Sequence, residues 1–130
     1  MKHTYKMIIA IVLLAVAIGA VSIYSFYMLN SSSSKMEKDI LAIENSIRNN
    51  NWDSAGDNLE KMQKSWSKTK KMWAVMLDHA EIDNIDITLS KLSSYIEMKD
   101  LALALAETAS LKQYIKHIPE KESANISNIF

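Results

Sequence analysis

The sequence predicts an all-α protein in which one N-terminal transmembrane helix is followed by a small four-helix bundle made of two helical hairpins. Two observations support this prediction. Residues 7–29 form an apolar run without a single charge. The segments after it repeat apolar residues at alternating spacings of three and four, which is the period of a helix face that packs against other helices.

Composition limits the function classes. At 130 residues the chain has room for one domain. Lys and Arg total 15 and so do Asp and Glu; because Lys2 and Lys6 precede the apolar run, the remainder carries 13 basic against 15 acidic residues. Such a mildly acidic module lacks the basic footprint of a nucleic-acid-binding protein. With no Cys, and with Gly only at Gly19 and Gly56, the chain has no thiolate site and no Gly-rich phosphate loop. We therefore expect no cofactor and no catalysis.

The apolar run at residues 7–29 predicts a span of the lipid bilayer. At about 1.5 Å of rise per residue the run is roughly 34 Å long, enough to cross the hydrocarbon core. A cleaved signal peptide is the alternative, since Lys2 and Lys6 precede small residues at 17–20. Apolar residues continue well beyond Ala20, however, which favours an uncleaved anchor.

The flanking charges predict the orientation of this span. Lys2 and Lys6 lie close to one end of the apolar run, whereas the other end is followed by the uncharged stretch 30–34. Because basic residues near a span favour the cytoplasmic side, residues 1–6 are expected to form a cytoplasmic tail. The C-terminal domain would then be extracytoplasmic on a single-pass cell-membrane protein.

Residues 30–34, Asn-Ser-Ser-Ser-Ser, read as a polar spacer before the bundle at residues 35–119. A first bundle helix is predicted at 35–48, and the Asn run at 49–51 ends it, with Asn51 capping the next helix. That helix is expected at 52–79. Its apolar stripe contains the following residues: Trp52, Ala55, Leu59, Met62, Trp66, Thr69, Trp73 and Met76.

A basic stripe runs beside the tryptophans, formed by Lys61, Lys64, Lys68 and Lys71. In one interpretation the two stripes together form a surface that grips an anionic partner, such as lipid headgroups or a wall polymer. In the other, the tryptophans belong to the core and the lysines form its solvated shoulder. The regularity of the stripe favours the second interpretation, because a bundle requires such a seam.

The apolar stripe changes phase around Ala80, which predicts a tight corner between two helices. A third bundle helix is expected at 80–97, with Asp86 suited to its first turn and Ile82 on its apolar face. A fourth is expected at 100–118, capped by Asp100, with Leu101 on its apolar, inward side. Pro119 is expected to end the fourth helix. The tail at 120–130 is predicted to fold back onto the bundle through Ile126, Ile129 and Phe130.

One set of residues forms a recognisable pattern: Trp66, Thr69 and Trp73, then Asp78-His79-Ala80-Glu81-Ile82-Asp83 with Ile85, and the closing Asn128-Ile129. In these residues the chain resembles a family of short proteins known as domain of unknown function forty-three sixty-three. The resemblance covers nearly the whole chain. It implies a single-span helical protein of Gram-positive, largely clostridial bacteria, sometimes encoded beside another small integral membrane protein, and it supplies no catalytic residues.

The acidic corner, Asp78, His79, Glu81 and Asp83, allows two interpretations. One imidazole with several carboxylates could ligate a divalent cation or act as a general acid and base. A single histidine is a thin ligand set, however, and carboxylates at the start of a helix ordinarily cap its N–H groups, while a histidine suits the end of the preceding helix. We favour the capping interpretation.

These observations predict a module that binds another protein, either a membrane-protein neighbour or a second copy of itself, besides the bilayer that holds residues 7–29. The alternative is a ligand or divalent-cation sensor centred on the acidic corner.

Overall fold

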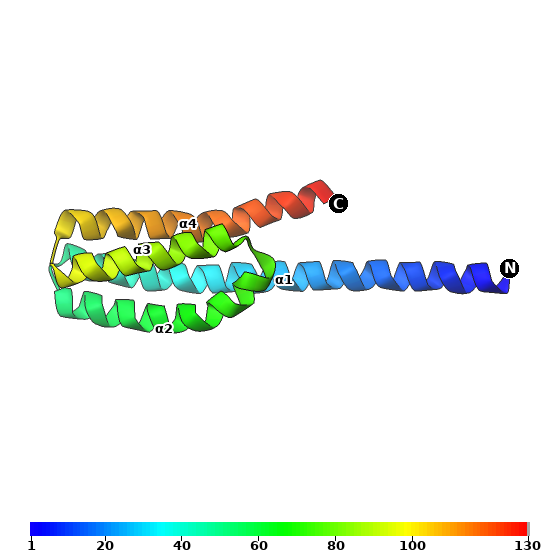
Figure 1. The fold of residues 1–130 in the computed structure, drawn as a ribbon, viewed down its shortest axis with the longest axis horizontal. Coiled ribbons are helices and arrows are strands. Elements are labelled where there is room, and N and C mark those ends of the chain that lie inside the picture. Colours follow the sequence, from blue (N-terminus) through cyan, green and yellow to red (C-terminus); the bar gives the residue numbers. More distant parts are fainter. Residues whose placement is uncertain (130) are drawn as a thin grey trace.

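The chain folds into four helices, and the sequence-predicted all-α class is confirmed. The computed structural model describes residues 1–129, apart from the side chains of Ile126 and Ile129. The helices run in the following order: α1 Lys2–Arg48, α2 Trp52–Met76, α3 His79–Glu97 and α4 Leu101–Ile129. Figure 1 shows α1 as one long rod, with α2, α3 and α4 gathered along its C-terminal half.

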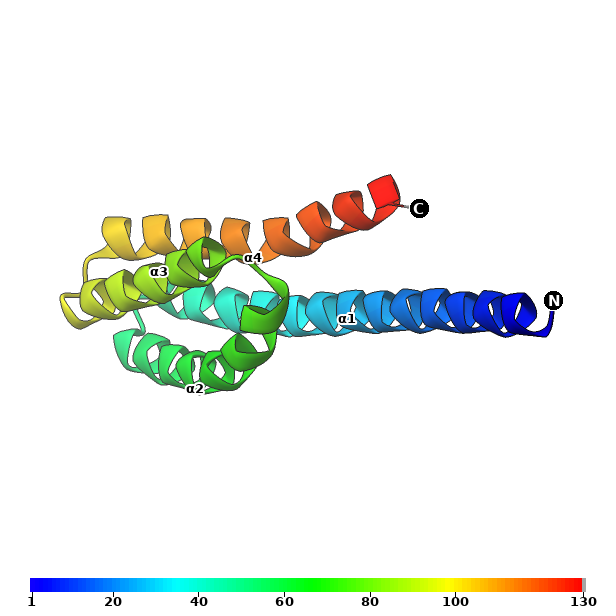
Figure 2. The same cartoon turned by 45° about the vertical axis from the view of Figure 1, so that its right-hand side comes forward.

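The four helices form an up-and-down bundle. Each helix packs on its neighbours in sequence, and α4 closes the ring against α1. Two turns, at 49–51 and 98–100, lie at one end, which we name the distal end; α1 leaves the bundle at the other, the proximal end (Figures 1 and 2). The core contains mainly Ile, Leu and Met from all four helices, together with Trp66 and Trp73.

The polar stretch at residues 30–34 is not a spacer, because α1 passes through it without a break. Two of its serines take part in packing between helices. The Ser32 hydroxyl accepts a hydrogen bond of 2.8 Å from Trp73 Nε1 and donates to the Met28 carbonyl of its own helix. Ser33 is buried. A small residue with a hydroxyl is compatible with a continuous helix when that hydroxyl has a partner.

Pro119 does not end the last helix, contrary to the sequence prediction, since α4 continues to Ile129. A proline inside a helix leaves the carbonyl four residues earlier without its N–H donor. That carbonyl belongs to Ile115, and it accepts a hydrogen bond of 2.8 Å from the buried Ser33 hydroxyl of α1. A side chain from another helix therefore replaces the missing donor, and the helix persists as a kinked element.

Residues beyond Pro119 lean away from α1 (Figure 2). Glu120, Lys121 and the segment 123–125 are exposed. The predicted tail that folds back on the bundle is thus replaced by a continuation of α4 to Ile129, about three further turns. The part of that prediction that concerned Ile126, Ile129 and Phe130 lies outside what the structure describes.

Both distal turns use the same local chemistry. Asn50 and Lys99 each adopt a φ of 54°, and the next residue caps the following helix. Asn51 accepts a bond of 3.2 Å from the Ser54 N–H, as Asp100 accepts one of 3.0 Å from the Leu103 N–H. These side-chain caps are the ones that the sequence predicts.

Candidate functional site

The tryptophan stripe of α2 lies mainly in the core. Trp66 and Trp73 are buried and meet edge to face, with ring centroids 5.4 Å apart, whereas Trp52 and Thr69 are half-buried. Each buried indole has a hydrogen-bond partner, which a buried Trp N–H requires. Trp73 donates to Ser32, and Trp66 Nε1 donates to Asp86 Oδ1 at 2.7 Å. The two buried tryptophans therefore hold the bundle together.

Asp86 is a polar junction that sequence reasoning assigned only to the first turn of a helix. Its carboxylate joins α3 to α2 by accepting bonds from Trp66 and from the Lys70 ammonium. Burial raises the pKa of Asp86, but the hydrogen bonds from Lys70 and Trp66 outweigh that effect and leave the pKa below its ordinary value. The donors lie 20 and 16 residues away, so no local sequence signal identifies the pair.

A second junction joins α1 to α4. Glu44 accepts a bond of 2.6 Å from Lys112 Nζ and one of 3.0 Å from Arg48. The hydrogen bond from Lys112 is the main cause of a lowered pKa at Glu44, in spite of its partial burial. Both carboxylates hold helices together.

The lysine stripe faces water. Lys61, Lys64, Lys68 and Lys71 are all exposed, and Lys64 pairs with Glu60 one turn away at 3.3 Å. Exposed pairs of this kind contribute little to stability. This is the arrangement expected of a solvated shoulder beside a buried seam.

The acidic corner begins at Asp78, in the short connection between α2 and α3, and continues into the first turns of α3. His79 is the first residue of α3 and not the end of α2, and Asp78 makes no side-chain capping bond. This corrects the capping interpretation, because the corner is made by a buried Leu77 and backbone bonds to the Asp78 carbonyl. Ile82 is buried in the core.

The acidic corner does not converge on one point. Asp78, His79 and Asp83 are exposed, while Glu81 is half-buried and pairs with Lys121 of α4 at 2.9 Å. Within residues 1–129, no group of three or more metal-ligating side chains is close enough to hold a cation. The geometry gives no support to a sensor at this corner.

Within the bundle, an exposed apolar surface lies on the outer side of α4 near the distal end. Six consecutive residues, 101–106, are Leu or Ala, yet of these only Ala104 is buried. Leu101 and Leu103 are 43% and 44% exposed. We name the exposed set the α4 apolar face; its members are Leu101, Ala102, Leu103, Ala106 and Ala109. Farther along, the same side of the helix becomes polar, with exposed Gln113 and Lys116.

The sequence does not indicate the α4 apolar face as a site, because leucine at helical spacing is typical of a core position. The sequence assigned Leu101 to the apolar side that packs inward, but the structure buries Ala104, Thr108 and Leu111 and leaves Leu101 exposed. A helix that is apolar on all sides is ordinarily covered on all sides. The alternation of Leu and Ala over residues 101–106 is the sequence feature that indicates apolar residues on the outer side of this helix as well.

One N-terminal helix, α1, is long and apolar enough to cross a membrane, and its apolar stretch is not buried in the fold. No curated protein and no solved structure matches the chain. A family model described as "Domain of unknown function (DUF4363)" matches residues 23–129, which include all of the bundle and the end of the apolar run. The chain therefore belongs to this family of unknown function.

Proposed function

We propose that this protein is a membrane-anchored helical module without catalytic activity that binds another membrane protein through the α4 apolar face. The observation that carries the proposal is the exposure of four of six consecutive Leu and Ala residues at positions 101–106. A contiguous exposed apolar surface is typical of an interaction site. Exposed alanines at 102, 106 and 109 lie along one side of α4 and permit the close approach of a partner helix.

The anchor in this proposal is the apolar half of α1. Residues from Met7 to Ile23 are exposed apart from half-exposed Gly19 and Ser22, so the bundle itself does not cover them. Such an apolar surface is compatible with the hydrocarbon core of a bilayer. We place the short N-terminal end in the cytoplasm and the bundle outside, in the cell membrane of a Gram-positive bacterium, as an uncleaved single-pass protein.

The geometry of α1 sets the height of the docking face. Leu29 enters the bundle core and Arg48 ends the helix at the distal turn, a rise of roughly 30 Å at about 1.5 Å per residue. Because α1 is continuous, the α4 apolar face is held at that height rather than moving on a flexible spacer. The partner must therefore have an extramembrane part that reaches about 30 Å from the bilayer.

Site-specific photocrosslinking in cells tests this function. A photoreactive amino acid at Leu103 is expected to give one dominant heteromeric product with a membrane protein, whereas the same amino acid at exposed Lys64 of α2 gives none. The substitution Ala106→Glu, made together with the Leu103 probe, should abolish the product because it places a charge in the apolar contact.

A product that forms equally from Leu103 and Lys64, or that survives Ala106→Glu, would contradict binding at this face. A product of twice the mass of the chain would show that the partner is a second copy of the chain and not another membrane protein. The far-UV circular dichroism of Ala106→Glu should match that of the unsubstituted chain, because Ala106 is exposed.

A further inference from the structure

A groove lies on the proximal side of the bundle, between α1, the end of α2 and the part of α4 that follows Pro119. There the last turns of α4 lean away from α1, and the end of α2 lies on the other side of α1 (Figures 1 and 2). The opening has a volume of about 240 Å³, and we name it the boundary groove. Its apolar walls are formed by Val21, Phe26, Leu29 and Met76.

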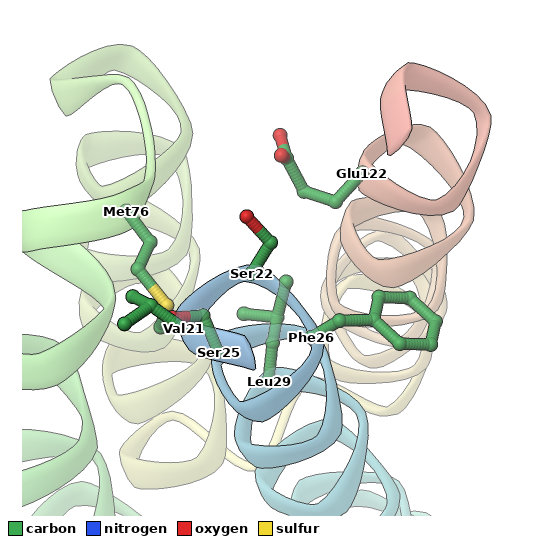
Figure 3. Close-up of a pocket in the computed structure, with 7 residues that line it drawn as sticks. All are labelled: Val21, Ser22, Ser25, Phe26, Leu29, Met76 and Glu122. Carbon is green, nitrogen blue, oxygen red and sulfur yellow. The ribbon is translucent and has the colours of Figure 1, made fainter. Parts of the chain in front are cut away.

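Three polar side chains complete the boundary groove. Ser22 donates to the Ile18 carbonyl of its own helix at 2.9 Å, and Ser25 makes no side-chain hydrogen bond within the described part of the chain. Glu122 of α4 extends over the opening, on the same side as the Ser22 hydroxyl (Figure 3). The groove thus combines an apolar floor with a carboxylate at its rim.

The carboxylate of Glu122 has no ion-pair partner among residues 1–129. Its neighbour Lys121 forms its ion pair with Glu81 of α3, at 2.9 Å. Glu122 is also half-buried, so its negative charge lies close to low-dielectric surroundings. A cation at this point would be attracted more strongly than at a fully hydrated carboxylate.

The position of the groove follows from the proposed function, on which this inference rests. If the apolar half of α1 spans the bilayer, residues 21–29 lie where the hydrocarbon core meets the headgroups. Exposed Tyr24 and Tyr27 occupy the same level, which is where aromatic side chains concentrate in membrane proteins. Lipid is then the molecule in contact with the opening.

We infer that the boundary groove binds a phospholipid with a primary ammonium headgroup, phosphatidylethanolamine. The ammonium donates hydrogen bonds to the Glu122 carboxylate, and the first methylenes of one acyl chain cover Val21, Phe26 and Met76. A choline headgroup carries the same charge but has no N–H group, so it forms only a weaker contact with the carboxylate. The groove therefore selects between two lipids of equal charge.

Lipid photolabelling of the full-length chain tests this inference. The protein is reconstituted in phosphatidylcholine vesicles that contain a trace of phosphatidylethanolamine with a diazirine next to the ester of its acyl chain, or of phosphatidylcholine labelled in the same way. We expect the ethanolamine probe to label peptides that contain residues 21–29 or Met76 about threefold more than the choline probe does. Glu122→Gln should reduce that ratio to one, while Glu120→Gln, which removes the same charge from the same end of α4, should leave it unchanged.

A groove-filling variant, Ser25→Phe, should lower labelling by both probes at these peptides. A ratio near one in the unsubstituted chain, or a ratio that survives Glu122→Gln, would overturn the inference. Flotation separates this result from failure of the proposed function: if the chain does not float with the vesicles, both the anchor and the lipid site are wrong. If it floats and labels without preference, only the lipid site is wrong.

Discussion

The distal and proximal ends of the bundle reverse the chain by different means. At the distal end, each turn is closed by a side-chain cap within three residues, from Asn51 and from Asp100. At the proximal end, Asp78 provides no such cap, and buried Leu77 and backbone bonds to the Asp78 carbonyl make the corner instead. Side-chain hydrogen bonds between helices lie near this end of the bundle. Ser33 bonds to the Ile115 carbonyl and Ser32 to the Trp73 indole.

This difference shows that the two ends of the bundle are stabilised by contacts of different sequence range. The distal turns form from short-range bonds and hold the α4 apolar face in a fixed position. The proximal end depends on side chains far apart in sequence, 82 residues in the case of Ser33 and Ile115. Substitutions should therefore be costly at the proximal end where a buried interhelical bond is lost, and moderate at the distal end. Chemical unfolding of the full-length chain in detergent micelles, followed by far-UV circular dichroism, measures each effect.

The largest effect is expected for Trp73→Ala at the proximal end. The substitution leaves a cavity in the core and removes the donor that Ser32 accepts from, so the free energy of unfolding should fall by about 3–5 kcal/mol. Trp52→Ala, at the distal start of α2, should cost clearly less because Trp52 is half-buried. Equal losses for the two variants would show that Trp73 is not packed as described.

A loss of about 1–3 kcal/mol is expected for Ser33→Ala, because the buried Ile115 carbonyl then has neither its helical donor nor the hydroxyl. Ser34→Ala is the matched control, since Ser34 is exposed on the same helix, and its effect should stay within about 0.5 kcal/mol. If Ser33→Ala is as mild as the control, α4 does not need this bond to pass Pro119.

Removal of a distal cap should cost about 1 kcal/mol, as measured for other helix N-caps. Asp100→Ala tests this at the start of α4, where the Leu103 N–H loses its acceptor. Asp78→Ala at the proximal corner should change the stability by less than about 0.5 kcal/mol, because its side chain makes no capping bond. The opposite order would contradict the contrast between the two ends.

The smallest effect concerns pH. The pKa values of Glu44 and Asp86 are lowered in the folded chain, relative to ordinary values of 4.5 and 3.8. Their stabilising contribution is therefore complete above those values and is lost as the pH falls through the lowered pKa of each group. Unfolding midpoints should drop between about pH 5 and pH 3. Asp86→Asn should weaken this dependence, whereas Asp83→Asn, which lacks such donors, should not.

The parts of the fold that depend on local signals could be predicted from the sequence. Asn51 and Asp100 cap helices because each acceptor and its donor are three residues apart. The change of apolar phase around Ala80 predicts a corner, which the structure places slightly earlier, at Leu77 and Asp78. The four amphipathic segments also depend on local spacing of apolar residues, and they specify the bundle.

The proximal end could not be predicted in this way. The consequence of Pro119 depends on a hydroxyl in α1, and the role of Ser33 depends in turn on the carbonyl freed by Pro119. Leu101 was assigned to the core because composition alone does not tell which side of an apolar helix remains uncovered. Both features depend on the relative rotation of packed helices, which periodicity does not determine.

The central claim, a bundle held outside the cell by an uncleaved α1, is tested most directly by cysteine labelling, since the chain has no native Cys. Lys64→Cys on the exposed side of α2 and Lys2→Cys at the N-terminus are treated with a membrane-impermeant maleimide. In intact cells Lys64→Cys should react, while Lys2→Cys should remain in the membrane fraction and react only after permeabilisation. Reaction of Lys2→Cys in intact cells together with protection of Lys64→Cys, or loss of Lys2→Cys from the mature chain, would contradict the account.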